Sequence, residues 1–373
     1  MEHQPRIRLG MVGGGADAFI GAVHRIAARI DDRYDLVAGA LSSTPERALA
    51  SGRRIGLAPD RIYADYAEMA RVEAAREDGI EAVAVVTPNH LHFAVAKAFL
   101  EQGIHVICDK PMTSTLEDAE TLRGLVESSG VRLMLTHNYS AYPMVREARR
   151  LVAEGALGEI RVVNVEYAQD WLAGAAESKQ SKWRLDPEQA GRGGAIADIG
   201  THALHLASFV SGLEPTSLSA DLHSFGAGRR VDDNAHIMLR YPNGARGLLW
   251  VSQVAVGNEN ALRLRVYGTR GSIEFDQEAP NRIWFTPIGE PRRLLTRGGA
   301  GFAGAARIPA GHPEGFLEAF ASLYAEFADD LRSPDAPRAP IPGVRDGVAG
   351  LRFIQAALDS SGRDGAWVAL DPA

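Results

Sequence analysis

Short apolar segments alternate with longer amphipathic segments through the first third of the chain, and this alternation constrains the fold more than any other feature. The short segments are apolar on both faces, as strands are when helices cover both sides of a parallel sheet. The longer segments have the three- and four-residue spacing of apolar positions that is typical of helices. We therefore predict a parallel sheet covered by helices. Its expected strands are residues 7–12, 34–41, 81–87, 105–108 and 131–136, and the expected helices include 92–103 and 115–130.

The pattern changes after about residue 157, where β-rich segments follow one another. Turn residues at 242–244 and 268–271 connect several of these segments, as in the hairpins of an antiparallel sheet. Helical patterns return at 314–332 and 344–360. We predict an α+β region with a large, open, mainly antiparallel sheet. Its expected strands lie within 159–168, 235–244, 245–255 and 262–276.

The chain length of 373 residues exceeds what one hydrophobic core usually holds, so we expect two domains. Residues 1–137 are expected to form the first domain. Residues 138–373 are expected to form a second domain for substrate binding and oligomerisation, with the last helices packing back on the first domain.

Composition excludes several classes of protein. Hydrophobic residues at 46% and charged residues at 23% are typical of a folded globular chain, and no apolar run approaches the roughly 20 residues of a membrane helix. The net charge of −7, without a long basic run, argues against nucleic acid or a membrane as a partner. Cys108 is the single cysteine, and residues 1–10 lack an apolar signal core, so we expect a cytoplasmic protein that acts on small molecules.

A glycine-rich stretch, GMVGGGADAF, follows the first predicted strand and precedes a helix. Gly13 and Gly15 would permit a tight turn and the close approach of a pyrophosphate, whose charge then faces the N-terminus of the helix. The usual third small position falls on Ala18, or on Gly21 if three residues are inserted. This context predicts a Rossmann-type dinucleotide-binding domain. The residues expected to contact the dinucleotide in this loop are Gly13, Gly15, Ala18, Phe19 and Ile20.

The end of the second predicted strand should lie beside the adenosine ribose. NAD-binding folds usually place an acidic residue there, whereas this chain has Ser42, Ser43 and Arg47. Hydroxyl groups with a guanidinium suit a 2′-phosphate better than a ribose hydroxyl. The expected cofactor is therefore NAD or NADP, with a preference for NADP.

The segment HVICDKPM delivers Lys110 directly after a buried strand. Ligands of parallel α/β sheets bind at the carboxyl ends of the strands, so the lysine is expected to point toward the nicotinamide. Pro111 ends the strand and holds the turn, because it has a fixed φ and no N–H group. An ammonium near an alcohol oxygen stabilises the negative charge that develops there, so we predict a catalytic role for Lys110.

Asp198 and His202 are four residues apart in a helical pattern, so their side chains are expected on one face. An imidazole has a pKa near neutrality, which suits a base that takes the substrate hydroxyl proton. Asp198 is expected to bind a substrate hydroxyl or to orient the imidazole. A metal site formed by Asp198, His202 and His205 is the weaker alternative, since no HExxH motif accompanies it, and we predict no metal.

Three segments together resemble the Gfo/Idh/MocA oxidoreductase family: VTPNHLHFAVAKAFLEQGIHVICDKPM, SKWR and GRGGAIADIGTHALHL. The resemblance extends from Ile7 to about Val368, with Asp109 in place of the commoner Glu. It implies an NAD(P)-dependent enzyme that transfers hydride between nicotinamide and a secondary alcohol or ketone of a sugar, inositol or related polyol. The implied catalytic residues are Lys110, Asp198 and His202. Implied cofactor contacts also include Thr87, Pro88, Asn89, His92, Asp109, Lys110 and Asn138, and implied substrate contacts are Lys110, Tyr139, Trp183, Arg184, Asp198 and His202. Two further substrate candidates come from the residues themselves: Trp171, in a polar loop whose composition suits sugar hydroxyls and an apolar ring face, and His312, which precedes a helix and is either a cap or a substrate contact.

Two other functions stay open at this point. One is an NAD-dependent glycoside hydrolase or lyase that oxidises its substrate transiently, and the other is a non-catalytic dinucleotide sensor. We also expect a homodimer or homotetramer, because the open sheet should expose apolar residues such as Leu248, Trp250 and Val266 to a partner. In contrast, residues 146–150 (REARR) are expected to form a solvated helix face.

Overall fold

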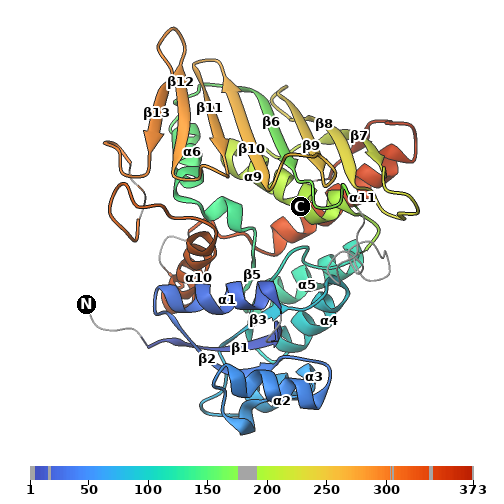
Figure 1. Ribbon diagram of the computed structural model, residues 1–373, viewed down its shortest axis with the longest axis vertical. Coiled ribbons are helices and arrows are strands. Elements are labelled where there is room, and N and C mark those ends of the chain that lie inside the picture. Colours follow the sequence, from blue (N-terminus) through green and yellow to red (C-terminus); the bar gives the residue numbers. More distant parts are fainter. Residues whose placement is uncertain are drawn as a thin grey trace. The chain divides into compact units, whose positions relative to one another are not determined.

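The structure is a computed structural model that describes residues 5–15, 18–174, 191–302, 304, 306–335 and 339–371. The chain forms two compact units, and the elements of both are labelled in Figure 1. The first unit contains Met1–Thr136 and Phe320–Val348, and the second contains His137–Ala319 and Ala349–Ala373. A boundary between units therefore falls within each of the last two helices, α10 (Phe316–Arg332) and α11 (Val344–Ser361).

The first unit is built on a parallel sheet of five strands in the order β2-β1-β3-β4-β5, which confirms the predicted α/β fold. All side chains of β3 are at most 5% exposed, because helices cover both faces of the central strands. The strand order reverses between β1 and β3, so these two neighbouring strands leave a crevice at their carboxyl ends, where such sheets bind ligands. The strands are β1 (Ile7–Gly13), β2 (Tyr34–Ala40), β3 (Ala82–Val86), β4 (His105–Cys108) and β5 (Leu133–Leu135).

Helices connect these strands, as the alternation of the sequence predicts. Thr115 caps α5 by accepting a hydrogen bond from the Asp118 N–H, and Gly130 ends this helix in the left-handed conformation that glycine permits. The helices of the first part of the chain are α1 (Phe19–Ile30), α2 (Pro45–Arg54), η1 (Pro59–Arg61), α3 (Tyr66–Ala74), α4 (Asn89–Leu100) and α5 (Leu116–Ser129).

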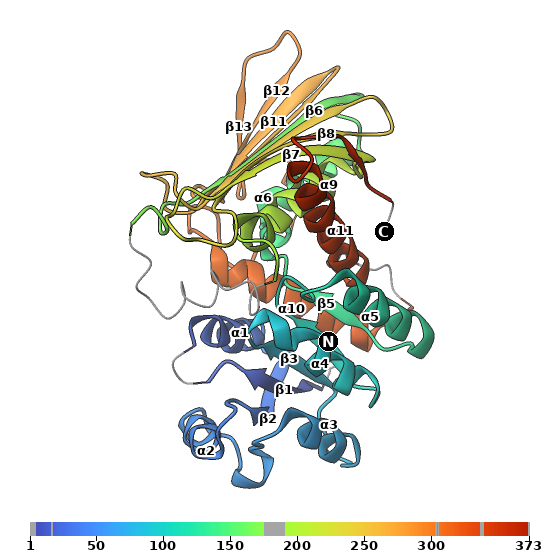
Figure 2. The same ribbon diagram turned by 90° about the vertical axis from the view of Figure 1, so that its right-hand side faces the viewer.

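The second unit is built on a sheet of nine strands in the order β13-β12-β11-β10-β6-β9-β8-β7-β14. Its pairs are antiparallel except β6–β9, which confirms the predicted large, mainly antiparallel sheet. Figure 2 shows α6 (Pro143–Ala153), α9 (Thr201–Ser211) and α11 on the same face of this sheet. The strands are β6 (Ile160–Ala168), β7 (Ser217–His223), β8 (Asn234–Arg240), β9 (Arg246–Ser252), β10 (Ala261–Gly268), β11 (Gly271–Asp276), β12 (Arg282–Pro287), β13 (Arg293–Thr296) and β14 (Val368–Ala369).

The helices of the second unit supply the apolar side chains that pack under the sheet. A 3-10 turn η2 (Asn138–Ala141) leads into α6 (Pro143–Ala153). A π-helical turn η3 (Ile196–Gly200) leads directly into α9 (Thr201–Ser211), whose residues are almost all buried.

The opposite face of the nine-stranded sheet corrects one prediction. Leu248 is 43% exposed on that face and Trp250 is partly exposed, but Val266 is fully buried and does not lie there. Cross-strand partners share a face, and Leu248 aligns through Asn164 with Arg265, the neighbour of Val266. Val266 therefore points toward the helix-covered core.

The expectation of a solvated REARR face is also wrong. Glu147 is 5% exposed and Ala148 is fully buried. The Arg149 guanidinium lies 4.5 Å from the centre of the Phe209 ring, and its Nη1 donates a hydrogen bond to the Phe209 carbonyl oxygen. Arg149 therefore joins α6 to α9, and Glu147 is buried in an ion pair with Arg150 of its own helix.

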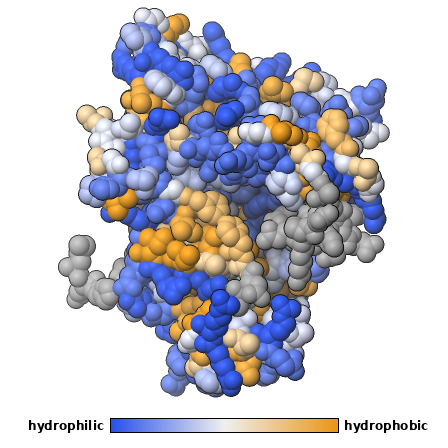
Figure 3. Space-filling view, in the orientation of Figure 1, coloured by the Kyte–Doolittle hydropathy of each residue, from blue (hydrophilic) through white to orange (hydrophobic). Residues whose placement is uncertain are grey.

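The surface seen in Figure 3 is mostly hydrophilic, with hydrophobic side chains in several small groups and one larger group. Among the described residues, the structure contains no helix that is both long enough and apolar enough to span a membrane. The apolar residues of the long helices instead pack within the two units, as the burial of Phe327 and Phe353 shows.

Candidate functional site

The turn from β1 to α1 is formed by consecutive glycines. Gly13 and Gly14 have positive φ values of 79° and 64°, which side chains rarely adopt. A Cβ atom added to Gly21 would lie 2.4 Å from the Gly14 Cα, so the first turn of α1 touches the loop directly. Arg25 holds the turn by donating a hydrogen bond to the Gly14 carbonyl oxygen at 2.5 Å. The predicted spacing selected Gly13 and Gly15 and missed Gly14, whose role depends on this contact.

The features of this turn fit a bound dinucleotide. A Cβ atom at Gly15 would lie 2.7 Å from the Leu41 carbonyl oxygen, so only glycine lets the loop pass the end of β2. Ala18 precedes α1 without a side-chain cap, and the described helix has no acidic residue in its first turn, which leaves a positive end for an anion. Phe19 is 64% exposed and Ile20 is partly exposed beside it.

The Thr87 hydroxyl lies at the carboxyl end of β3, next to the glycine turn. The methyl group of the Thr87 side chain would lie 2.9 Å from a Cβ atom added to Gly13. Its Oγ1 atom is buried and has no hydrogen-bond partner within the described part of the chain. A buried hydroxyl without a protein partner is suited to a ligand atom, so the crevice fits the ribose or phosphate groups of a dinucleotide.

The residues after β2 lie on the surface. Ser42 Oγ accepts a hydrogen bond from the Thr44 N–H at 3.4 Å, and Ser43 is exposed. Arg47 is exposed near the start of α2. The structure therefore presents hydroxyl groups directly after β2 and a guanidinium in the first turn of α2, on the edge strand that pairs with β1 and the helix that follows it.

The Asp-Lys-Pro segment forms a tight loop after β4. The Asp109 carboxylate accepts hydrogen bonds from the Lys110 N–H at 3.0 Å and from Thr136 Oγ1 at 2.8 Å. The peptide bond between Lys110 and Pro111 is cis, and Lys110 is partly buried. These bonds indicate that Asp109 holds the loop that carries Lys110.

His92 connects two loops of the first unit. Its Nδ1 lies 2.7 Å from the Pro111 carbonyl oxygen and its Nε2 lies 2.9 Å from the Thr87 carbonyl oxygen. The ring is 1% exposed. Both ring nitrogens thus face protein carbonyls, so we propose that His92 positions the ends of β3 and β4 rather than contacting the dinucleotide. Pro88 is the exposed N-cap of α4, and Asn89 is its first residue.

Asp198 and His202 are carried by the π-helical turn and the start of α9. The turn is anchored by Asp232, whose carboxylate accepts hydrogen bonds from the Gly194 N–H and the Ile196 N–H, both at 2.7 Å. Burial raises the pKa of Asp232 to about 6, against the backbone hydrogen bonds that lower it. Turns of this type are frequent at functional sites because the extra residue redirects side chains.

His202 is 6% exposed and faces a second histidine. Its Nδ1 lies 3.3 Å from the Nδ1 of His137, and His205 stacks on His137 with ring centres 4.3 Å apart. Asp198 accepts a hydrogen bond from Gln253 Nε2 at 2.9 Å. Across the described residues, no group of three His, Cys, Asp or Glu side chains is arranged to hold a metal ion. Sequence reasoning missed His137, because the residue is remote from the Asp198 motif in the chain.

Two of the predicted substrate contacts, Tyr139 and Trp171, are joined by a chain of hydrogen bonds. Tyr139 contacts His202 with ring centres 4.8 Å apart, and its hydroxyl lies 2.6 Å from the Tyr167 hydroxyl. Asn260 donates to the Tyr139 hydroxyl at 3.1 Å and accepts from Gln169 at 2.7 Å. Trp171 Nε1 donates to Gln169 Oε1 at 2.9 Å, which joins the exposed tryptophan to the buried network. Burial raises the pKa of the Tyr139 hydroxyl, so the network is built from neutral donors and acceptors.

Asn138 lies in the same η2 turn as Tyr139, whereas the predicted residue His312 lies in a separate loop. Asn138 is 2% exposed, and its Nδ2 has no hydrogen-bond partner among the described residues, which suits a ligand carbonyl. The exposed His312 precedes α10, and its carbonyl oxygen accepts a hydrogen bond from Arg297 Nη2 at 2.5 Å. Trp183 and Arg184 lie outside the described residues.

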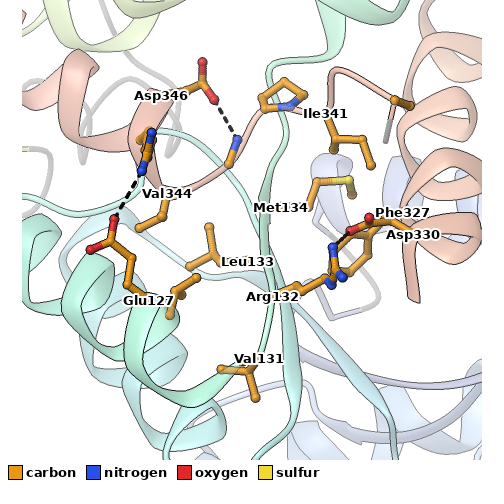
Figure 4. Close-up of a pocket in the computed structure, with 16 residues that line it drawn as sticks. Glu127, Val131, Arg132, Leu133, Met134, Phe327, Asp330, Ile341, Val344 and Asp346 are labelled. Atoms are coloured by element: carbon orange, nitrogen blue, oxygen red, sulfur yellow. Dashed lines mark hydrogen bonds and ion pairs between the residues drawn. The ribbon is translucent and has the colours of Figure 1, made fainter. Parts of the chain in front are cut away.

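A separate cavity of about 530 Å³ lies beside β5 in the first unit (Figure 4). Arg132 and Asp330 form an ion pair of 2.5 Å at its wall, and Asp346 accepts a hydrogen bond from the Gly343 N–H. Val131 and Arg132 precede β5, so this cavity borders the amino end of the strand and not the carboxyl ends that bind ligands in this fold. We therefore do not assign the dinucleotide to it.

The switch in strand order, the glycine turn and the Lys110 loop together define a dinucleotide-binding protein. Comparisons with known proteins agree with this class. Residues 7–137 match the family described as "Oxidoreductase family, NAD-binding Rossmann fold", and residues 145–274 match the "GFO/IDH/MocA C-terminal domain". The chain belongs to the Gfo/Idh/MocA family of oxidoreductases, and it is an NAD(P)-dependent enzyme acting on CH–OH groups.

Three similar proteins illustrate the relationship. The oxidoreductase YfiI of Bacillus subtilis (strain 168) is 33% identical over 97% of this chain and 96% of its own length. A crystal structure of an oxidoreductase from Sinorhizobium meliloti is 55% identical, with a TM-score of 0.91 over 98% of this chain and 100% of that chain. An inositol dehydrogenase homolog from Azotobacter vinelandii, complexed with NAD+, is 38% identical, with a TM-score of 0.94 over 99% of this chain and 98% of that chain.

Proposed function

We propose that the protein oxidises a secondary alcohol of a sugar, inositol or related polyol with NAD(P)+, and that it catalyses the reverse reduction. The observation that carries the proposal is the buried His202, which lies in the first turn of α9, directly after the π-helical turn that carries Asp198, and whose ring contacts that of Tyr139. Related structures support the substrate class: the Azotobacter vinelandii homolog was crystallised with NADH and myo-inositol, and levoglucosan dehydrogenase with NADH and levoglucosan.

In this proposal three residues each have a separate role in the oxidation of the alcohol group. His202 takes the hydroxyl proton as the C–H bond breaks, and Lys110 stabilises the negative charge on the oxygen. Asp198 accepts a hydrogen bond from a second hydroxyl of the substrate and so selects polyols. The bound dinucleotide supplies the hydride acceptor. Reduction of the ketone reverses these roles.

A panel of sugars and inositols, followed through the nicotinamide absorbance with each cofactor, tests the proposal. With the preferred substrate, His202→Ala should lower kcat by about 10² to 10⁴ and leave dinucleotide binding nearly intact. Lys110→Met should lower kcat and also weaken dinucleotide binding. The exposed His223 provides a matched control, since His223→Ala should keep the wild-type rate. A wild-type kcat in His202→Ala would remove His202 from the mechanism.

The same panel separates the other functions. Turnover of a glycoside without net formation of NAD(P)H would indicate a hydrolase or lyase. Dinucleotide binding without turnover of any substrate would indicate a sensor. Either result would replace the dehydrogenase proposal.

We further propose that NADP is the preferred cofactor, because Arg47 and Ser43 are exposed at the end of β2. Arg47→Ala should then weaken NADP+ binding while NAD+ binding stays the same, since only NADP+ carries the 2′-phosphate. Arg53→Ala, at an exposed position in the last turn of the same helix, is the control. Equal losses for the two cofactors would contradict the preference.

A further inference from the structure

His202 and His137 contact each other within the second unit. His137 precedes the η2 turn and is 2% exposed. The two Nδ1 atoms are 3.3 Å apart, so one ring donates a hydrogen bond and the other accepts it. A neutral imidazole carries one proton, so this bond couples the tautomer of each ring to that of the other.

The direction of the bond follows from the role of His202, and this step rests on the proposed function. Nδ1 of His202 faces His137, so a substrate proton must be taken by Nε2. A neutral ring with an Nε2 lone pair carries its proton on Nδ1, and that N–H then donates to His137 Nδ1. His137 in turn carries its own proton on Nε2.

We propose that His137 is a positioning residue that holds His202 in the Nδ1–H tautomer and stabilises the imidazolium formed when His202 takes the substrate proton. In hydrolase triads a carboxylate performs this task for the catalytic histidine. Here a neutral imidazole lies at that position. As a hydrogen-bond acceptor, His137 makes His202 a stronger base, and because His137 is neutral it adds no second full charge to the buried site.

The surroundings fix the orientation of both rings. His205 stacks on His137 at an interplanar angle of 8°, whereas the His137 and His202 rings meet edge to face at 84°. Ser140 Oγ donates to the His137 carbonyl oxygen at 2.8 Å and holds the backbone. The titratable groups in contact with His202 within the described part of the second unit include His137, which precedes the η2 turn, Tyr139 from that turn and Tyr167 from β6. Burial raises the pKa of both tyrosine hydroxyls, and the nearby charge of Asp198, from the π-helical turn, also raises the pKa of each.

The tautomer can be read without turnover. Two-bond ¹H–¹⁵N spectra of the protein with labelled histidine report which ring nitrogen carries the proton, and the spectrum of His202→Ala assigns the His202 signals. We expect the Nδ1–H tautomer for His202 in the wild-type protein. His137→Phe, which keeps a ring stacked against His205, should populate the Nε2–H form. An Nε2–H tautomer in the wild-type protein would overturn the inference.

Kinetics give the second readout. His137→Phe should lower kcat by about tenfold or more while KM and NADPH binding stay near wild type. The apparent pKa of the rising limb of kcat against pH should fall by about one unit, because the acceptor that stabilised the imidazolium is lost. His137→Gln keeps an acceptor oxygen and should recover most of the rate and the pH profile.

The controls separate this inference from the proposed function. Adding His137→Phe to His202→Ala should cause no further loss of kcat, because the two residues act through one proton. If His202→Ala is inactive and His137→Phe keeps both the wild-type rate and pH profile, the role of His137 is wrong while the proposed function stands. If His202→Ala keeps the wild-type rate, the proposed function itself fails.

Discussion

At the scale of single residues, the dinucleotide turn depends on a contact between two glycines. Gly21 Cα lies so close to the loop that a Cβ atom at Gly14 would be 2.9 Å from it. The turn therefore needs small residues for two reasons, the positive φ at Gly14 and the missing Cβ at Gly21. A search for the spacing of glycines in the turn covers Gly14 more readily than Gly21, which lies in the following helix.

We expect Gly21→Ala to destabilise the first unit and to weaken dinucleotide binding. The added methyl group would meet backbone atoms, which cannot rotate away, so the loss should be about 1–3 kcal/mol, as for other overpacked sites. Denaturant unfolding and a titration with NAD(P)H measure the two effects. Gly124→Ala is the matched control: Gly124 lies exposed within α5 with open space around its Cα, so alanine should stabilise by about 0.5–1 kcal/mol. Equal stability of Gly21→Ala and the wild-type protein would contradict the close contact.

At the scale of elements, α1 packs against α10 within the first unit through a buried histidine. His24 is fully buried, its Nδ1 lies 2.8 Å from the Tyr324 hydroxyl, and its ring centre lies 5.2 Å from that of Phe320. Burial lowers the pKa of His24 to about 4, and Asp109 opposes this shift. A polar ring in such an interface makes the packing of the helices sensitive to pH.

The sign of that dependence follows from the two pKa values. Between the ordinary value of 6.5 and about 4, the unfolded chain binds a proton at His24 that the folded chain does not. The stability from the neutral ring is therefore complete above pH 6.5 and is lost as the pH falls toward 4. The expected loss is on the order of 3 kcal/mol.

His24→Phe should reduce this loss of stability, as measured by urea unfolding at a series of pH values. Asp232 contributes with the opposite sign, because its raised pKa of about 6 makes stability fall as the pH rises from 3.8. The contribution of Asp232 is the same in His24→Phe and in the wild-type protein, so it cancels when their unfolding free energies are subtracted at each pH. His223→Phe, at an exposed position, should show no change in the pH dependence. Identical slopes for His24→Phe and the wild-type protein would rule out the role of His24.

At the scale of the whole molecule, the open face of the nine-stranded sheet mixes apolar and charged side chains. Met238 and Leu248 are 50% and 43% exposed on neighbouring strands. Ion pairs join Arg263 to Asp276 and Arg265 to Glu166 on the adjoining strands. Such a surface, apolar in part and lined with charges, is suited to pairing with a second copy of itself.

We therefore keep the prediction of a homodimer or homotetramer that packs through this face. Leu248→Asp should lower the mass measured by sedimentation at micromolar concentration, because the carboxylate would be buried against apolar groups. Val256→Asp is the control: Val256 is 81% exposed but lies after the end of β9, so this variant should keep the wild-type mass. A monomeric mass for the wild-type protein would reject the prediction.

The sequence by itself determined the parallel sheet, the glycine turn and the position of Lys110 after β4, because these depend on local periodicity and on residues close together in the chain. It selected Asp198 and His202 by their spacing in the same way. Periodicity shows which residues share a face, but not which face is covered, and so Val266 was placed wrongly and Glu147 was expected in solvent.

Only the tertiary structure decided the contacts between distant segments. His137 and His202 are 65 residues apart, and they meet because the η2 turn and α9 lie in the same unit. Asp232 reaches the start of the π-helical turn from a loop 36 residues farther along the chain. Local patterns carry no information about such pairs, since the packing of whole elements brings these side chains together.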